Sequence, residues 1–519
     1  MPNQFFPSNS NNLHNGHPSP EIRPKRKRRF FFWLVLATIV LGVVFLASMA
    51  LAYKFYSTSK KVIEKNPPAS FFQSLRQVAS SERKTLRGES GGRINILLLG
   101  LAGENYPGEN LTDSIIIASV DPKTYKTAMI SVPRDFYVQI PDTSSYTKIN
   151  ALYARGVDRN GKATEGIEDL KSALTDITGL PIHYYVALDF DGFKKFIDEL
   201  GGVKIQVPKD IHDERYPGPN FSYQTFDLKQ GLYTFDGETA LKYARTRHDE
   251  DGDFGRAARQ QLILESARSK AFSIGTLLNI PAVNNIMNIL GDHLRTDVPL
   301  DEMETFLELS KKIDTHLTIN KVLDAGKADS LMAVSHVAMG RVRAFILVPR
   351  TGSYDEIKDL AKNIFDLELV ERKKQAIANE KATVAVVNVS GESGFEKKLN
   401  TLITKLGYQV QTEMPATIKS QRPTLRNQTS IIDLTNGLKP FSLEDLSKKF
   451  SAEISENTPG NVPPQCQKAY FCLIAGSNLI DSLNYEEGTI EDLENEYDKQ
   501  IVDEREYIEL LKKGTNKKN

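Results

Sequence analysis

The stretch INILLLG, at residues 94–100, opens the part of the chain whose pattern decides the fold. Two similar runs follow, SIIIASV at 114–120 and AMISV at 128–132, and short apolar runs of this kind predict buried β-strands. Further along, YYVAL (184–188) and VKIQV (203–207) also read as strands, whereas IEDLKSALTDIT (167–178) and FDGFKKFIDEL (190–200) carry apolar residues at helical spacing. Strands that alternate with helices predict an α/β layered domain.

The organisation changes towards the C-terminus. We expect the α/β domain to cover 93–375 with its core at 93–270, and residues 271–375 to be mainly helical and to end in the strand and turn RVRAFILVPRTGSYDE (341–356). A compositional break lies near 376–381. Beyond it, TVAVVNVSG, the helical EKKLNTLITKLG and YQVQTEM begin a β-α-β pattern, which predicts a small α+β accessory domain over 383–476. A charged tail follows at 481–519.

The N-terminus has the pattern of a membrane anchor. Residues 1–29 are polar and Pro-rich, which predicts a disordered tail, and they end in RPKRKRR. The uncharged run 30–53 is long enough to span a bilayer as one helix, and 54–92 reads as a stalk. The basic flank predicts a cytoplasmic N-terminus and an extracytoplasmic body. A cleavable signal peptide ending near Ala50-Leu51-Ala52, or a nucleic-acid patch at RPKRKRR, are the alternatives.

Charge and cysteine content exclude several classes of protein. Lys+Arg and Asp+Glu are both 66, yet the first 29 residues hold six basic residues and one acid, so the remainder carries a net charge of −5. The body is therefore not a general polyanion binder, and we expect no nucleic-acid partner. Two cysteines exclude a disulfide-rich scaffold and a cysteine-rich metal site. Cys466 and Cys472 are either a small-loop disulfide or two reduced thiols.

Two short segments place polar groups at the ends of expected strands. Asp113 directly precedes the run 114–120, where a carboxylate can bind a divalent cation or can simply cap a turn. Arg134 and Asp135 follow the run 128–132, where the chain leaves the sheet. Ligands of open α/β sheets bind beyond strand ends, so the pair is either part of a site or a surface ion pair.

A third segment, ALKYARTRHDEDGDFGRAARQQ, is rich in arginine. Arg245 and Arg247 are two apart on an expected extended stretch and would point the same way. Arg256 and Gln260 are four apart on an expected helix and share a face. Arginines converging from two elements form a diphosphate clamp, whereas the interspersed acids would instead make a solvated salt-bridge loop.

Five motifs occur in a fixed order: INILLLG…LTDSIIIASV, ISVPRDFYVQIP, KINALYARG, YYVALDFDGFKKFIDELGGV and FDGETALKYARTRHD…GDFGRAARQQ. Together they resemble the LytR-CpsA-Psr (LCP) family of bacterial envelope proteins, over about 93–270 and at the widest to 365. The segment 383–475 is similar to the LytR C-terminal domain. A cytoplasmic tail and a single membrane span also fit the family topology.

The resemblance implies an LCP ligase, a membrane-anchored phosphotransferase that moves a glycopolymer from a polyprenyl-pyrophosphate carrier onto peptidoglycan, commonly with magnesium. Apolar side chains of the sheet and of helix 190–200 would line a lipid tunnel. The residues expected to act in catalysis are Asp113, Arg134, Asp135 and Arg247. Those expected to bind the pyrophosphate are Arg134, Lys148, Asn150, Arg245, Arg247, Arg256, Arg259 and Gln260. Asp135 or Asp249 is the expected general base.

The sequence departs from the family pattern at the expected metal site. Many members have a second Asp in a G-x-D stretch before the Asp113 position, but here GLAGENYPGEN offers only Glu104 and Glu109. Asp113 and Glu104 are the candidate Mg²⁺ ligands. Two rival functions use the same residues: a non-catalytic envelope protein that binds glycan or lipid carrier, and a polyprenyl-pyrophosphate phosphatase. A membrane-tethered transcriptional attenuator is disfavoured because the tail lacks a helix-turn-helix pattern.

Overall fold

The computed structural model describes residues 83–104, 106, 108–160, 163–217, 222–246, 252–273, 286, 288–314, 317–325, 330–339, 342–411, 424–456 and 462–483. The expected tail, membrane span, most of the stalk and the segment 484–519 lie outside these residues. Arg247 and Asp249 lie outside them as well. Within the described ranges, no helix is both long and apolar enough to cross a bilayer.

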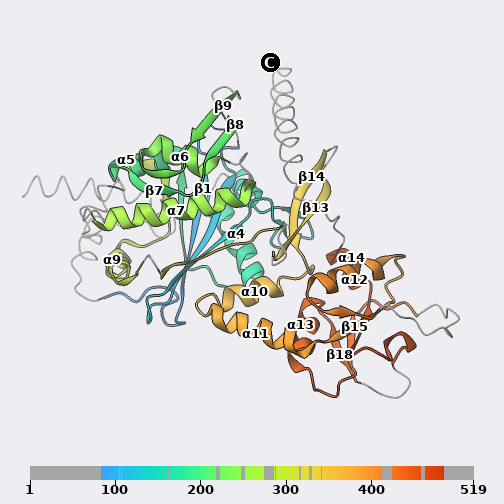
Figure 1. Cartoon of the computed structure of the whole chain (residues 1–519). Helices are drawn as coiled ribbons and strands as arrows, with labels where there is room; N and C mark the ends of the chain where they lie inside the picture. The colour runs from blue at the N-terminus through green and yellow to red at the C-terminus, as the bar shows by residue number, and fades with distance from the viewer. Residues whose placement is uncertain are drawn as a thin grey trace, which may run out of the picture. The chain divides into compact units, whose positions relative to one another are not determined.

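A mixed six-stranded sheet is the centre of the N-terminal domain, as the strand pattern predicts (Figure 1). Its order is β11-β6-β1-β2-β3-β12. The β1, β2 and β3 strands form an antiparallel meander, β6 runs parallel to β1, and β12 runs parallel to β3. The strands span Ile94–Leu101 (β1), Thr112–Val120 (β2), Thr127–Val132 (β3), Tyr184–Asp189 (β6), Leu294–Thr296 (β11) and Ile319–Val322 (β12).

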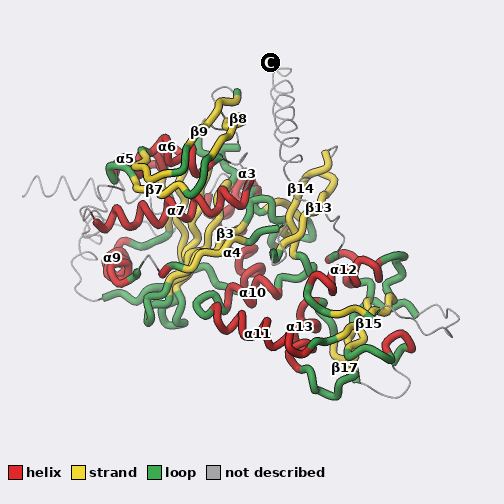
Figure 2. The backbone as a smooth tube through the Cα atoms, viewed as in Figure 1, coloured by secondary structure: helices red, strands yellow, loops and turns green. Residues whose placement is uncertain are grey.

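The two faces of this sheet contact different helices. Alternate residues such as Leu97, Leu99 and Ile115 are buried in one large core with α4. The intervening residues, such as Leu98 and Ile116, face a cavity lined also by α5, α6 and α7. Because side chains alternate along a strand, the same strands serve both faces. Figure 2 shows α7 lying across the strands.

Helices and short hairpins complete the domain. The helices are α3 (Ala151–Asn160), α4 (Ala163–Thr178), α5 (Phe190–Glu199), α6 (Gly237–Arg245), α7 (Gly252–Ser273) and α9 (Met303–Lys312). Two-stranded sheets form from β4 (Tyr137–Gln139) with β5 (Tyr146–Lys148), β7 (Val203–Val207) with β10 (Gly231–Phe235), and β8 (Ile211–Pro217) with β9 (Tyr223–Leu228).

Residues 271–375 contain more strand than the expectation of a mainly helical segment allows, although helix still covers more of their described part than strand does. Their described part holds β11, β12 and the hairpin of β13 (Met332–Met339) and β14 (Val342–Pro349), besides α9, α10 (Asp355–Lys362) and most of α11 (Leu367–Glu380). β11 and β12 are only three and four residues long and form the edges of the main sheet. Strands this short carry no alternation that a sequence pattern can detect.

The C-terminal domain is a second α/β unit, and its elements fall where the β-α-β pattern places them. Its five-stranded sheet has the order β16-β15-β19-β17-β18. The strands are β15 (Thr383–Asn388), β16 (Gln409–Val410), β17 (Ser430–Asp433), β18 (Glu453–Ser455) and β19 (Phe471–Ala475), and the helices are α12 (Phe395–Lys405), α13 (Pro440–Lys449) and α14 (Asn478–Ser482). Cys466 and Cys472, left open by the sequence, form a disulfide within a buried cluster beside this sheet.

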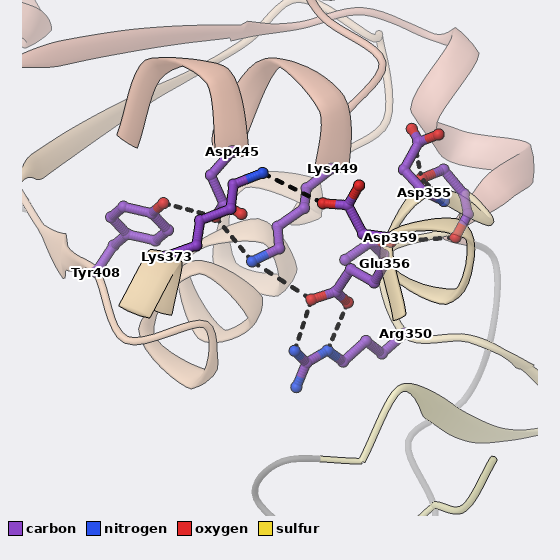
Figure 3. Close-up of polar contacts among 10 residues, drawn as sticks. Arg350, Asp355, Glu356, Asp359, Lys373, Tyr408, Asp445 and Lys449 are labelled. Atoms are coloured by element: carbon purple, nitrogen blue, oxygen red, sulfur yellow. Dashed lines mark hydrogen bonds and ion pairs between the residues drawn. The ribbon is translucent and has the colours of Figure 1, made fainter. Parts of the chain in front are cut away.

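A charged network connects the two domains (Figure 3). The Glu356 carboxylate on α10 accepts hydrogen bonds from Nε and Nη2 of Arg350, both at 2.7 Å. Lys449 on α13 lies 3.3 Å from the same carboxylate and 2.8 Å from Asp445, which accepts a hydrogen bond from the Tyr408 hydroxyl. Burial acts to raise the pKa of Glu356, but the hydrogen bond from Arg350 and the charge of Lys449 outweigh it and hold the pKa below 4.5.

Replacing Glu356 by glutamine should lower the free energy of unfolding by about 2 kcal/mol at neutral pH, because two partly buried cations lose their shared counter-ion. The difference from wild type should shrink as the pH falls below the ordinary value of 4.5, since a carboxylate with a depressed pKa loses its stabilisation as pH drops through the folded-state pKa. Urea denaturation at neutral and acidic pH measures both effects.

The matched control is Glu444→Gln, which removes an exposed carboxylate on the same helix as Lys449. Exposed ion pairs contribute little, so this change should cost less than about 0.5 kcal/mol. Equal stability losses in the two variants would contradict the role given to Glu356.

Candidate active site

One edge of the central sheet gathers the polar residues of interest. Leu101, at the end of β1, pairs with Thr112 at the start of β2 and with Asp189 at the end of β6. In the antiparallel pair of β2 and β3, Ile115 pairs with Val132. Extending that register by two residues sets Asp113 opposite Arg134, so two segments distant in the sequence meet at this edge.

Asp113 and Arg134 form an ion pair at this position. The Nη1 atom of Arg134 lies 3.0 Å from Oδ1 of Asp113, and both side chains are partly buried. Burial acts to raise the pKa of Asp113, but the charges of Arg134, Arg256 and Arg245 outweigh it and hold that pKa below its ordinary value of 3.8. Asp113 is therefore ionised at neutral pH, and the three guanidinium groups around it leave an excess of positive charge.

Asp135 is buried beside this pair and is held by cations. Its carboxylate lies 2.7 Å from the Lys148 ammonium and 3.4 Å from Nε of Arg134. Asn150 contributes through its backbone, because its N–H donates to the Arg134 carbonyl and its own carbonyl accepts from the Thr112 N–H. Asn150 thereby bridges the segments that carry Arg134 and Asp113.

Arg245 reaches the site from the end of a helix. The expectation of an extended segment is wrong for this residue, because Asp236 caps the start of α6 by accepting from the Thr239 N–H, and the helix continues through Arg245. Its guanidinium carbon lies 4.4 Å from the Phe190 ring centroid, a cation–π distance, and its Nη1 lies 3.5 Å from the Tyr216 hydroxyl. Neither aromatic contact is signalled by the sequence pattern.

The α7 helix carries three residues predicted to bind the pyrophosphate, and only two of them line the polar pocket. Arg256 and Gln260 line a small polar pocket with Asp113 and Arg134, as their helical spacing predicts. Arg259 is buried, and its guanidinium donates to the backbone carbonyls of Tyr243 and Thr246. We therefore assign Arg259 to holding the end of α6 rather than to the pocket.

An apolar cavity of about 330 Å³ adjoins the polar pocket. Its walls come from the sheet and from α5, α6 and α7, including Leu98, Ile116 and Phe193. Ser114 and Gln260 line both spaces, and Arg245 lies in the wall of the cavity. The sequence analysis missed Ser114, although its position one residue after Asp113 on the cavity face of β2 could have indicated it.

The acidic residues expected to bind a metal lie in different surroundings. Within the described residues, no group of three or more His, Cys, Asp or Glu side chains is arranged to hold an ion. Glu104 is exposed in the loop after β1 and does not line the pocket that contains Asp113. Asp113 is engaged by Arg134, and the expectation that Asp113 and Glu104 bind Mg²⁺ remains a prediction.

Fold and site define the class: a mixed α/β protein whose cationic pocket adjoins an apolar cavity. The model of the LytR_cpsA_psr family matches residues 50–338, which is more than half of the chain, and the chain therefore belongs to this family. The family expectation drawn from the five motifs is confirmed.

Several relatives have names that describe a role. "Regulatory protein MsrR" of Staphylococcus aureus (strain COL) is 36% identical over 213 residues, covering 41% of this chain and 58% of that protein. The teichoic acid transferase TagV of Bacillus subtilis is 35% identical over 231 residues, 43% of this chain and 55% of the relative. The teichoic acid transferase TagU of Oceanobacillus iheyensis is 30% identical over 289 residues, which are 54% of this chain and 82% of that relative. The chain thus spans little more than half of the first two relatives.

Among solved structures, that of B. subtilis TagV aligns with a TM-score of 0.41 and 26% identity, covering 52% of this chain and 96% of TagV. A structure of TagT bound to LI-WTA aligns with a TM-score of 0.40 and 22% identity. The alignment covers 55% of this chain and 94% of the TagT chain.

Replacing Arg245 by alanine should weaken the binding of inorganic pyrophosphate roughly ten- to thirty-fold, because one charge-assisted contact is worth about 1.5–2 kcal/mol. Isothermal titration calorimetry measures the affinity. Arg155→Ala, which removes an exposed arginine on α3, should leave the affinity unchanged. Identical affinities for the two variants would exclude Arg245 from the anion site.

Proposed function

We propose that this protein transfers a glycopolymer from a polyprenyl-pyrophosphate carrier to peptidoglycan, as a membrane-anchored cell-wall ligase. The observation that carries the proposal is the junction at Ser114 and Gln260 between the arginine-lined pocket and the apolar cavity. An amphiphile with a diphosphate head and a hydrocarbon tail matches that junction, because its two parts need adjacent sites of opposite polarity. The names of TagV and TagU support the choice of a cell-wall glycopolymer.

The cationic residues would bind the diphosphate of the donor. Arg134, Arg245 and Arg256 provide guanidinium groups that fork onto phosphate oxygens, and Gln260 adds an amide donor. Lys148 contacts the Asp135 carboxylate, and that carboxylate in turn contacts Arg134 and helps to hold its side chain in place. Arg247 would add a further cation, as the family motif implies. Neutralising the non-bridging oxygens and fixing the head group are the main requirements of phosphoryl transfer.

The reaction exchanges one P–O bond for another. A hydroxyl oxygen of the acceptor sugar attacks the phosphorus that carries the glycopolymer, and a new phosphodiester forms. The bond to the lipid phosphate breaks, and the polyprenyl monophosphate leaves with the electron pair. Asp113 is the carboxylate that lines the polar pocket, so we assign to it the proton of the attacking hydroxyl. Asp135 is less suited as the base because it is buried between Lys148 and Arg134 and is not among the residues that line the polar pocket.

The expected location is outside the cytoplasm, with residues 30–53 as the anchor and the body facing the wall. The disulfide between Cys466 and Cys472 supports this placement, since such bonds persist in oxidising compartments. A lipid carrier also requires a site close to the membrane, which a short stalk would provide.

The transfer assay uses the purified full chain, lipid-linked glycopolymer and peptidoglycan, with mass spectrometry of both products. A phosphodiester-linked glycan and polyprenyl monophosphate would support the ligase. Glycan phosphate released to water would identify a phosphatase instead. Lipid binding without any product would identify a non-catalytic binding protein.

Val186→Phe tests the lipid cavity. Val186 lies on β6 in the cavity wall, and an added ring would fill space that the tail needs. The affinity for polyprenyl pyrophosphate should fall by about ten-fold or more, the equivalent of a few lost methylene contacts, while inorganic pyrophosphate binds as before. Val186→Ala, which leaves the space open, is the control. Unchanged lipid affinity in the phenylalanine variant would contradict the assignment of the cavity.

Magnesium, which the family resemblance implies, would bind together with the diphosphate, since Mg²⁺ is usually held by one or two carboxylates and by substrate phosphates. Calorimetric titration of the full chain with Mg²⁺ alone should therefore show no binding, whereas Mg²⁺ should tighten the binding of inorganic pyrophosphate. EDTA should suppress transfer. Tight binding of Mg²⁺ to the ligand-free protein would contradict this joint binding.

A further inference from the structure

Two stacked tyrosines stand on the surface beside the candidate active site. Tyr137 on β4 and Tyr146 on β5 have ring centroids 5.5 Å apart and planes inclined by 27°. The Tyr146 side is open to solvent, with 51% of the residue exposed. Single exposed aromatic residues are common on protein surfaces, but a fixed pair of stacked rings is a preformed binding surface.

The hairpin that carries the tyrosines is firmly held. Val138 alternates with Tyr137 along β4 and is buried in the main core, together with Ile140 and Ile149 at the ends of the hairpin. Phe136 is fully buried and packs edge-on against Tyr354. The tyrosine rings therefore stand on a rigid base, so a ligand would lose little free energy to ordering them.

The platform is continuous with the active site. Tyr137 pairs directly with Lys148 across the hairpin, and Tyr146 lies two residues before Lys148 on the same strand, so the three side chains share one face. The Lys148 ammonium contacts Asp135, which contacts Arg134. Because the two rings stack on each other, a ligand would stack on the outward face of Tyr146, and from there it would extend towards the residues proposed to hold the reacting phosphate.

The surroundings of the rings indicate a sugar. Gln139 shares their face and is exposed, with its amide nitrogen donating to the Thr143 carbonyl, and the connecting loop exposes the side chains of Ser144 and Ser145. A pyranose ring has an apolar C–H face for an aromatic ring and a rim of hydroxyl groups for amide and hydroxyl partners. Asp142, exposed in the same loop, disfavours a polyanionic chain.

From these observations we propose that Tyr146, backed by Tyr137, forms a stacking platform for an uncharged sugar of the acceptor glycan. The inference rests on the proposed function, because the lipid-linked donor would occupy the cavity beyond Ser114 and Gln260. The platform would then orient the acceptor hydroxyl towards Arg134 and Asp113.

The test titrates the full chain with chitotetraose, a β-1,4-linked N-acetylglucosamine tetramer, by isothermal titration calorimetry. Wild type should bind weakly, and Tyr146→Ala should weaken binding roughly five- to ten-fold, the worth of one aromatic contact. Tyr146→Phe keeps the ring and should retain most of the affinity. Tyr470→Ala removes an exposed tyrosine of the C-terminal domain and should change nothing.

In the transfer assay, Tyr146→Ala should raise the KM for the acceptor and leave the binding of polyprenyl pyrophosphate unchanged. The platform is wrong if wild type fails to bind the tetramer at about 10 mM, an affinity below that of weak specific ligands, or if Tyr146→Ala binds it equally well. If wild type does not bind polyprenyl pyrophosphate, the proposed function is wrong. The titration with the tetramer uses a different ligand, so its result tests the platform independently.

Discussion

The pairing of β2 with β3 is the constraint on which the site depends. Its register sets Asp113 opposite Arg134, and their ion pair fixes the orientation of both side chains. A shift of this register by one residue would turn every side chain of β2 to the opposite face. It would move Ser114 and Ile116 out of the cavity wall as well, so the anion pocket and the apolar cavity are set by the same alignment.

The two faces of the central sheet have different roles: one packs into the main core, and the other lines the apolar cavity. Its α4 face is filled by side chains and contributes to stability, since buried apolar area is the main favourable contribution to folding. Its other face leaves a cavity between the strands and α7. An unfilled apolar space costs stability in a protein interior. Its retention next to a cluster of arginines is therefore best understood as a site for a ligand rather than as poor packing.

The sequence predicted the strands of the meander, α4, α5 and the β-α-β order of the second domain, because each has a clear apolar period. The family motifs also predicted that Arg134, Arg256 and Gln260 share one site, and all three line the polar pocket. The sequence pattern missed β11 and β12, whose pairing with distant strands leaves no local pattern. Arg245, predicted on an extended segment, is instead the last residue of α6, which Asp236 caps at its start. The sequence also predicted Arg259 as a pyrophosphate ligand. Its guanidinium instead donates to backbone carbonyls, which a sequence pattern cannot reveal.

The hairpin of β13 and β14 sets how small a working fragment of this protein can be. The family match ends at residue 338, yet Leu347 on β14 donates its N–H to the carbonyl of Asp135, and Ile357 and Ile364 still belong to the main core. Excision at the end of the family match would strip support from the turn that holds Arg134. A minimal excised domain must extend through α10 and at least to Ile364, and its Glu356 would then present its carboxylate without Lys449.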